Sequence, residues 1–278
     1  MKKILFVSHT ANFSKFNRSF MKWFREQGWN VYYASDGEEP ILDCDYSYKI
    51  CFSRSPFNLN NIKAYHRLKN IIEKEKFDII HCHTPVGGAI ARLAARKARK
   101  YGTKVIYTGH GLHFYKGAPV LNWLLYYPAE KFCAKYTDCL ITINEEDYNN
   151  VKHFQFQAGM MKRVHGVGVP LERFYCHTLE EKQLLRKQYR YKKDAFILIC
   201  VAEINKNKNQ RFLIEAVRKL YKRHPEIKLL LVGKGPVQGE LEQRVKEENI
   251  GDIVQFLGYR SDVQNLIALS DILVTASY

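Results

Sequence analysis

Lys3-Ile-Leu-Phe-Val-Ser8, close to the first residue, is a short and almost continuously apolar stretch that predicts a β-strand over Ile4–Val7. Similar runs recur along the first half of the sequence, at Val31–Ala34, Ile79–His81, Val105–Thr108 and Cys139–Ile143. Strands that are apolar throughout are typical of a parallel sheet that is buried on both faces. Helix-like segments lie between them, at Ser19–Gln27, Asn61–Glu75, Ala89–Tyr101 and Tyr126–Tyr136. This alternation predicts a doubly wound α/β domain with right-handed crossovers.

The pattern is interrupted once and then starts again. Val164-His-Gly-Val-Gly-Val-Pro170 holds two glycines and a proline, and the charged, helix-like stretch Leu179–Tyr189 follows it. We therefore expect an N-terminal Rossmann-like domain over 1–170, a linker over 171–190, and a second Rossmann-like domain over 191–278. Its expected strands are Phe196–Val201, Lys228–Val232, Ile253–Phe256 and Ile272–Ala276, and its expected helices are Gln210–His224, Gln238–Glu248 and Asp262–Ala268.

The sequence ends at Tyr278, directly after the last of these strands. A parallel sheet needs a crossover helix at that point, and loops that contact ligands follow the carboxyl ends of strands in such folds. We therefore expect the second domain to be incomplete, with the truncation close to its active site.

Composition narrows the class of protein. The chain has 278 residues, a formal net charge of +16 and 46% hydrophobic residues, as expected of a folded globular protein with an acidic partner. No apolar stretch near the start is long enough for a signal peptide, and the seven cysteines form no CxxC pair. We therefore expect reduced thiols and a cytoplasmic location.

Two lysine-containing turns of the second domain are candidates for phosphate binding. Glu203-Ile-Asn-Lys-Asn-Lys-Asn209 connects a predicted strand to a helix, so Lys206 or Lys208 lies near a helix N-terminus, where phosphate is attracted. Gly233-Lys-Gly-Pro236 follows the next strand in the same way; either stretch can also be an ordinary polar turn. In the first domain, the turn Ser8–Phe16 lacks glycine, which argues against a nicotinamide or flavin cofactor there.

Histidines gather at the predicted strand ends of the first domain. His81 and His83 point to one side of an extended segment, and His110 and His113 follow the next strand. A metal site is one interpretation, but no carboxylate or cysteine has a recognised ligand spacing, so buried and hydrogen-bonded histidines are favoured. Gly109 and Gly111 flank His110 and allow its backbone to approach a ligand.

The ordered set of motifs resembles the family 4 retaining glycosyltransferases of the GT-B fold, especially those of bacterial capsule and exopolysaccharide assembly. The resemblance covers essentially the whole chain. It rests on Lys3–Ser8, Phe77–Thr84, Thr108–Gly111, Gly168–Phe174, Val201–Lys208, Leu231–Pro236 and Phe256–Asp262.

The resemblance implies an acceptor-binding first domain and a second domain that binds a nucleotide sugar, UDP-linked, with the two domains facing each other across a cleft. Transfer to a lipid-linked or saccharide acceptor would retain the anomeric configuration, and neither a cofactor nor a metal is expected. Catalysis would depend on stabilising the departing nucleotide diphosphate. His110 would be catalytic; the residues implied in acceptor binding are His9, His83 and Gly109, and those implied in donor binding are Glu203, Lys208, Gly233, Gly235 and Tyr259.

Three positions depart from the family pattern. Ala11-Asn-Phe13 replaces a glycine-rich turn, and Glu203 stands where an arginine often precedes the diphosphate lysine. A pair of glutamates that holds the sugar and ribose hydroxyls would follow Tyr278.

An anionic membrane surface is a further expected partner. Arg92, Arg96 and Arg99 fall on one face of the predicted helix Ala89–Tyr101, and each cation near an anionic leaflet contributes about 1 kcal/mol. Pro119–Tyr127 adds aliphatic and aromatic surface that could contact lipid. The alternatives are a solvated helix face and core packing.

Two other functions compete with sugar transfer. A nucleic-acid-binding protein would explain the charge, but no helix-turn-helix, zinc-finger or RNP motif is present, so we expect no nucleic acid partner. A sugar-nucleotide epimerase of similar architecture would convert the donor without an acceptor.

Overall fold

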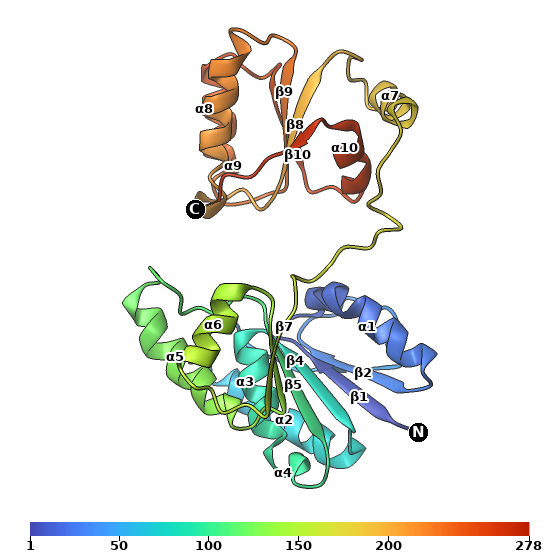
Figure 1. The fold of residues 1–278 in the computed structure, drawn as a ribbon, viewed down its shortest axis with the longest axis vertical. Helices are drawn as coiled ribbons and strands as arrows, with labels where there is room; N and C mark the ends of the chain where they lie inside the picture. Colours follow the sequence, from blue (N-terminus) through green and yellow to red (C-terminus); the bar gives the residue numbers. More distant parts are fainter. Residues whose placement is uncertain (278) are drawn as a thin grey trace. The chain divides into compact units, whose positions relative to one another are not determined.

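The computed structural model describes residues 1–277, and the chain divides into two compact units, Met1–Gly168 and Val169–Tyr278. Each unit is a parallel β-sheet covered by helices (Figure 1). The segment 171–190, expected to be a linker, belongs to the second unit and contains helix α7, Leu179–Gln188. None of the helices within residues 1–277 is long and apolar enough to cross a lipid bilayer.

The first unit holds a seven-stranded sheet in the order β3-β2-β1-β4-β5-β6-β7, and every neighbouring pair is parallel. Five of these strands match the apolar runs, whereas β3 and β7 were not predicted because these edge strands are polar and largely exposed. The strands are β1 Lys3–Val7, β2 Asn30–Ser35, β3 Tyr46–Lys49, β4 Ile79–His83, β5 Lys104–Gly109, β6 Cys139–Thr142 and β7 Met160–Arg163.

The helices of this unit are α1 Ser14–Glu26, α2 Asn60–Glu75, α3 Pro85–Ala94, α4 Arg96–Arg99, α5 Val120–Ala134 and α6 Glu145–His153, with a 3-10 turn, η1, at Ala11–Phe13. Three of them begin four or more residues earlier than predicted, since α1 starts at Ser14 rather than Ser19, α3 at Pro85 rather than Ala89, and α5 at Val120 rather than Tyr126. The single helix predicted over Ala89–Tyr101 is instead two helices, which meet at Ala95.

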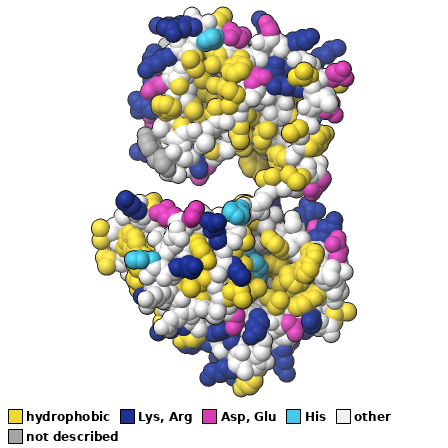
Figure 2. Space-filling model, viewed as in Figure 1, with side chains coloured by type: hydrophobic (Ala, Val, Ile, Leu, Met, Phe, Trp, Pro, Cys, Tyr) yellow, Lys and Arg dark blue, Asp and Glu magenta, His cyan; other side chains and the backbone are white. Residues whose placement is uncertain are grey.

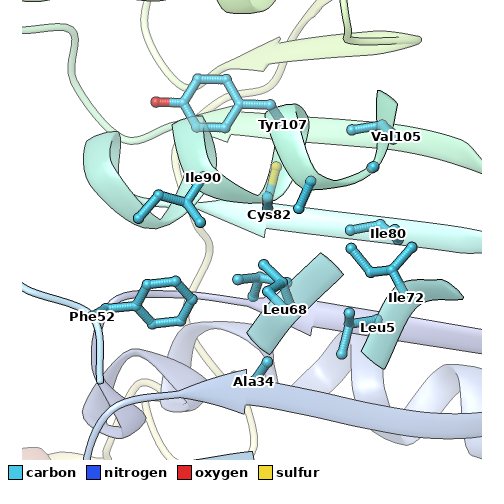
Figure 3. Packing of buried hydrophobic residues seen from close by; sticks show 14 of the residues in the cluster. Leu5, Ala34, Phe52, Leu68, Ile72, Ile80, Cys82, Ile90, Val105 and Tyr107 are labelled. Atoms are coloured by element: carbon cyan, nitrogen blue, oxygen red, sulfur yellow. The ribbon is translucent and has the colours of Figure 1, made fainter. Parts of the chain in front are cut away.

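Side chains alternate between the two faces of the sheet, as the pleat of a strand requires. Ile4 and Phe6 of β1 pack with Met21 of α1 on one face. Leu5 and Val7 point to the other face, where Figure 3 shows Leu5 beside Ile80 of β4 and Ile72 of α2. Helices on both faces bury every strand of the sheet's centre, which explains the continuously apolar runs.

Arg92 was expected on an exposed basic face of the helix that follows β4, but it is buried. Its side chain is 1% exposed, forms an ion pair with Glu130 of α5 at 2.8 Å, and lies over the Tyr107 ring at 3.8 Å. Tyr107 Oη donates to the other oxygen of Glu130 at 2.9 Å. Arg99 is likewise engaged, because it donates to both carboxylate oxygens of Asp138. Arg92 and Arg99 therefore stabilise the fold, whereas Arg96, the third arginine of the expected basic face, is exposed.

The second unit repeats the same design with four parallel strands in the order β10-β9-β8-β11. Its elements are β8 Phe196–Val201, η2 Lys206–Lys208, α8 Gln210–Tyr221, β9 Ile227–Val232, α9 Gln238–Glu247, β10 Val254–Gly258, α10 Val263–Leu269 and β11 Ile272–Leu273, in addition to α7. All seven elements expected over 191–278 are present, within a few residues of their predicted ends.

Arg186 ties α7 to this sheet. Its side chain is buried and donates to the backbone oxygens of Leu269 and Lys193 and to the carboxylate of Asp271. Asp271 also accepts a hydrogen bond from the Ile197 amide at the start of β8. The helix therefore packs as part of the second unit.

Candidate active site

The order of the strands determines where a ligand can bind in each unit. In the first sheet β1 lies between β2 and β4, and in the second β8 lies between β9 and β11. In the first sheet the chain leaves β1 toward β2 and leaves β4 toward β5, on opposite sides, so these two loops diverge at the carboxyl ends of their strands, where ligands bind in folds of this kind. His9 follows β1, His83 ends β4, and the loop from Ala202 to Asn209 follows β8.

The turns after β1 and β4 are in direct contact. The amide of His9 donates to Thr84 Oγ1 at 3.3 Å. Gly87 in the first turn of α3 makes this approach possible, because a Cβ at that position would lie 3.0 Å from the His9 nitrogen. Any larger residue at 87 would push the β1 turn away from the helix. His9 is therefore held at the crevice through its backbone.

Three histidines form a cluster beside these turns, with their rings tilted against one another. The rings of His81 and His83 are 4.3 Å apart, which confirms that both point to the same face of β4. His83 Nδ1 lies 3.1 Å from Nε2 of His110, which follows β5, and His81 Nε2 lies 2.9 Å from Thr108 Oγ1. Phe13 covers the cluster, with its ring 4.8 Å from His110 and 5.4 Å from His83.

Burial keeps these histidines uncharged. It lowers the pKa of His81 to about 3 and the pKa of His83 well below its ordinary value, and their neighbouring histidines reinforce both shifts. Burial also lowers the pKa of His110, which is more exposed to solvent. At neutral pH the cluster therefore offers hydrogen bonds but no positive charge.

The loop that carries His110 is anchored by a residue that the sequence analysis did not identify. Asp147 of α6 is buried, and its carboxylate accepts hydrogen bonds from the Leu112 amide at 2.9 Å and from Asn144 Nδ2 at 2.7 Å. Gly111 has a φ of +112°, a conformation that L side chains rarely adopt. Gly109 at the end of β5 and Gly111 therefore frame His110 in a loop with a fixed backbone path.

In the second unit, three neighbouring loops are joined through their backbones. The Ile204 amide donates to the Lys234 oxygen at 3.1 Å, and the Gly233 amide donates to the Gly258 oxygen at 2.8 Å. A Cβ on Gly233 would overlap the Ala202 carbonyl oxygen, and one on Gly235 would overlap that of Ile204. The Gly-Lys-Gly turn is thus required for close packing of the loops after β8 and β9.

Lysines project from these loops without a carboxylate partner. None of the ion pairs that the second unit forms up to residue 277 includes Lys206, Lys208 or Lys234. Asn205 caps the η2 turn by accepting the Lys208 amide at 2.9 Å. The Lys208 ammonium is close enough to lower the pKa of the Cys200 thiol, although burial is the larger effect and raises that pKa overall.

The remaining predicted donor residues lie at the same edge of the sheet. The Glu203 carboxylate accepts a hydrogen bond from Asn205 Nδ2 at 3.0 Å. Tyr259 directly follows β10, and its side chain is 76% exposed. The structure therefore brings the loops that contain Glu203, Lys208, Gly233, Gly235 and Tyr259 together. Over residues 1–277, no three His, Cys, Asp or Glu side chains gather into a group that could hold a metal ion.

Two family patterns match the chain in succession. Residues 3–144 match the family described as glycosyl transferase 4-like, and residues 181–278 match glycosyl transferases group 1. Over its full length the chain also superposes on Anabaena HepE, solved in complex with UDP and glucose, with a TM-score of 0.76, 17% identity and coverage of 74% of HepE. The two Rossmann-like units are those of the GT-B class of α/β fold.

Sequence relatives agree with these matches. The chain is 45% identical over 277 residues to the glycosyltransferase EpsD of Bacillus subtilis. This match covers 99% of this chain and 73% of EpsD. It is 28% identical over 223 residues to the Escherichia coli UDP-Gal:alpha-D-GlcNAc-diphosphoundecaprenol alpha-1,3-galactosyltransferase, which covers 79% of this chain and 57% of that enzyme. The chain therefore belongs to the glycosyl transferase 4-like family of glycosyltransferases. The relatives favour neither an epimerase nor a nucleic-acid-binding protein.

The buried histidines predict how the stability of the N-terminal unit depends on pH. An unfolded histidine takes up a proton near pH 6.5, whereas His81 stays neutral in the folded chain down to about 3. The unfolded state then binds more protons, so the free energy of unfolding falls as the pH drops below about 6.5, by about 1.4 kcal/mol per pH unit for each such histidine.

Urea unfolding at a series of pH values checks this, followed by tryptophan fluorescence, because all three tryptophans lie in the first unit. Replacing His81 by Asn should remove one histidine's share of the slope. An identical slope in the wild type and in His81→Asn would contradict the assignment.

Proposed function

We propose that this protein transfers a sugar from a UDP-sugar to a lipid-linked saccharide in the assembly of a bacterial surface polysaccharide. The names of its relatives support the two substrates. The E. coli enzyme is named for a UDP-galactose donor and a diphosphoundecaprenol-linked acceptor, and HepE was solved with UDP and glucose.

The lysines of the second unit carry the proposal for the donor. Lys206, Lys208 and Lys234 lie on the loops after β8 and β9, beside the central strand of the second sheet, and no ion pair formed within residues 1–277 neutralises them. The phosphates of a nucleoside diphosphate bound there would neutralise the positive charge of these lysines. As the bond to the sugar breaks, negative charge builds up on the departing diphosphate, and fixed ammonium and amide groups stabilise it. No metal ion is needed for this step.

The first unit would hold the acceptor and the reacting end of the sugar. His9, His83, Gly109 and His110 lie at the carboxyl ends of β1, β4 and β5. Because the histidines are neutral, His110 would act through a hydrogen bond to a hydroxyl or phosphate oxygen rather than as a cation. We assign it the catalytic contact of this unit.

Replacing Lys208 by Met should weaken UDP binding about tenfold or more, because a charge-assisted hydrogen bond contributes roughly 1.5–3 kcal/mol. Titration calorimetry with UDP measures the dissociation constant. Lys208→Arg should retain most of the affinity, and Lys219→Met, at an exposed position of α8, should leave it unchanged. Equal affinities of Lys208→Met and the wild type would refute the donor site.

Retention of the anomeric configuration is supported by the resemblance to retaining enzymes. We expect an α-linked product from an α-linked UDP-sugar, and proton NMR of the fresh product distinguishes the two anomers by their coupling constants. A product that first forms as the β-anomer would show inversion.

We further propose that the protein works at the cytoplasmic face of the membrane and that α5 provides the contact. Trp123 and Tyr127 of this helix pack inward onto Phe114 and Phe154. Val120, Leu121 and Leu124 instead point outward and are 73%, 63% and 67% exposed. Hydrophobic side chains are visible at this end of the N-terminal unit, at its left edge in Figure 2. Such a face can insert at the boundary between headgroups and acyl chains.

Changing Leu121 and Leu124 together to Gln should weaken binding to phosphatidylglycerol vesicles at least tenfold, since burial of each leucine contributes about 1.5–3 kcal/mol. Vesicle co-sedimentation measures this. Leu59→Gln is the matched control, because Leu59 is 74% exposed but precedes α2. Undiminished binding of the double variant would exclude α5 as the membrane contact.

A further inference from the structure

The pair formed by His83 and His110 shares one hydrogen bond between two ring nitrogens. His83 Nδ1 and His110 Nε2 are 3.1 Å apart, so one of the two must carry the proton and the other must accept it. Both rings are neutral at pH 7, because burial disfavours the charged form of each. Two arrangements are therefore open, and they present different atoms of His110 to a ligand.

The other ring nitrogen of His83, Nε2, distinguishes the two proton arrangements. His83 Nε2 is fully buried and has no hydrogen-bond partner among the described residues. If His110 donated, the proton of His83 would sit on this nitrogen as a buried N–H without an acceptor. If His83 donates, the same nitrogen is a bare lone pair. Among buried backbone groups, an N–H without an acceptor is rarer than an under-satisfied acceptor, and the same preference applied to the ring favours the bare lone pair.

We infer that His83 donates through Nδ1 to His110 Nε2 and so fixes the proton of His110 on Nδ1. His83 is then a positioning residue, and His110 offers its Nδ1–H as a neutral hydrogen-bond donor. In this form its Nδ1 cannot accept a proton from a hydroxyl, so His110 orients an oxygen of the substrate and does not deprotonate it. Only this last step, the contact with a substrate oxygen, rests on the proposed function.

Surrounding contacts support the fixed geometry. Phe13 packs edge-on against His110 with their ring centroids 4.8 Å apart, and the His81 ring lies 4.3 Å from the ring of His83. The loop of His110 is held by the bond from the Leu112 amide to Asp147. Neither ring can turn over without breaking the shared hydrogen bond.

The test is a long-range proton–nitrogen correlation spectrum of the full chain with ¹⁵N-labelled histidine at neutral pH, which reports the protonated nitrogen of each ring. The His110→Gln variant identifies the His110 signals by their loss. We expect His110 to be protonated on Nδ1 in the wild type. Protonation on Nε2 would overturn the inference and leave the proposed sugar transfer untouched.

Two variants of His83 test the cause. In His83→Phe, Nε2 of His110 has no donor, and the Nδ1–H form should give way to a mixture of both tautomers. In His83→Gln, the side-chain amide can donate in place of the imidazole and should restore the Nδ1–H form. His113→Phe, on the same loop but packed against Tyr126, should change nothing at His110. An unchanged His110 spectrum in His83→Phe would contradict the role of His83; if that variant does not fold, the wild-type spectrum and His83→Gln decide.

Discussion

Both units depend on one constraint: the first strand of each parallel sheet lies in the interior of the sheet and has a neighbouring strand on each side. β1 pairs with β2 on one side and with β4 on the other, and β8 pairs with β9 and β11 in the same way. Helices must then cover both faces, and in the first unit the loops after β1 and β4 run to opposite sides. Polar side chains follow the central strands at their carboxyl ends, whereas the strands themselves are buried among apolar side chains.

The electrostatics of the two units differ at these edges. In the first unit, burial holds His81, His83 and His110 in their uncharged form. In the second unit, lysines stand on loops whose backbones are locked to one another through Gly233 and Gly235. A neutral, hydrogen-bonding surface suits sugar hydroxyls, and a rigid cationic surface suits a diphosphate. The net charge of +16 alone therefore does not locate a binding site for an anion, because cations such as Arg92 are already paired with carboxylates.

Sequence reasoning worked best where local pattern and burial coincide. β8 was predicted to the residue, because six apolar residues lie between charged turns. The edge strands β3 and β7 have no apolar pattern, and the buried polar residues Ser14 and Asn17 hide the first turns of α1. The glycine turns and the strand-end histidines of the candidate site are likewise local features, so the sequence alone could mark them as candidates.

Long-range partners could not be predicted. The partner of Arg92 lies 38 residues away on another helix, so the arginine was interpreted as a surface cation. Asp147 reaches the Leu112 amide from 35 residues away, and nothing in its local sequence marks that contact. Alternation along β4 gave the side on which His83 lies, but the pairing of His83 with His110 depends on the register of β4 against β5.

In the proposed function, the joined loops of the second unit hold a nucleoside diphosphate. Backbone hydrogen exchange of the chain with and without UDP tests it directly. We expect slower exchange of the amides in 202–209 and 233–236 when UDP is added, with no change in α5. Protection confined to the first unit, or no protection anywhere, would contradict it.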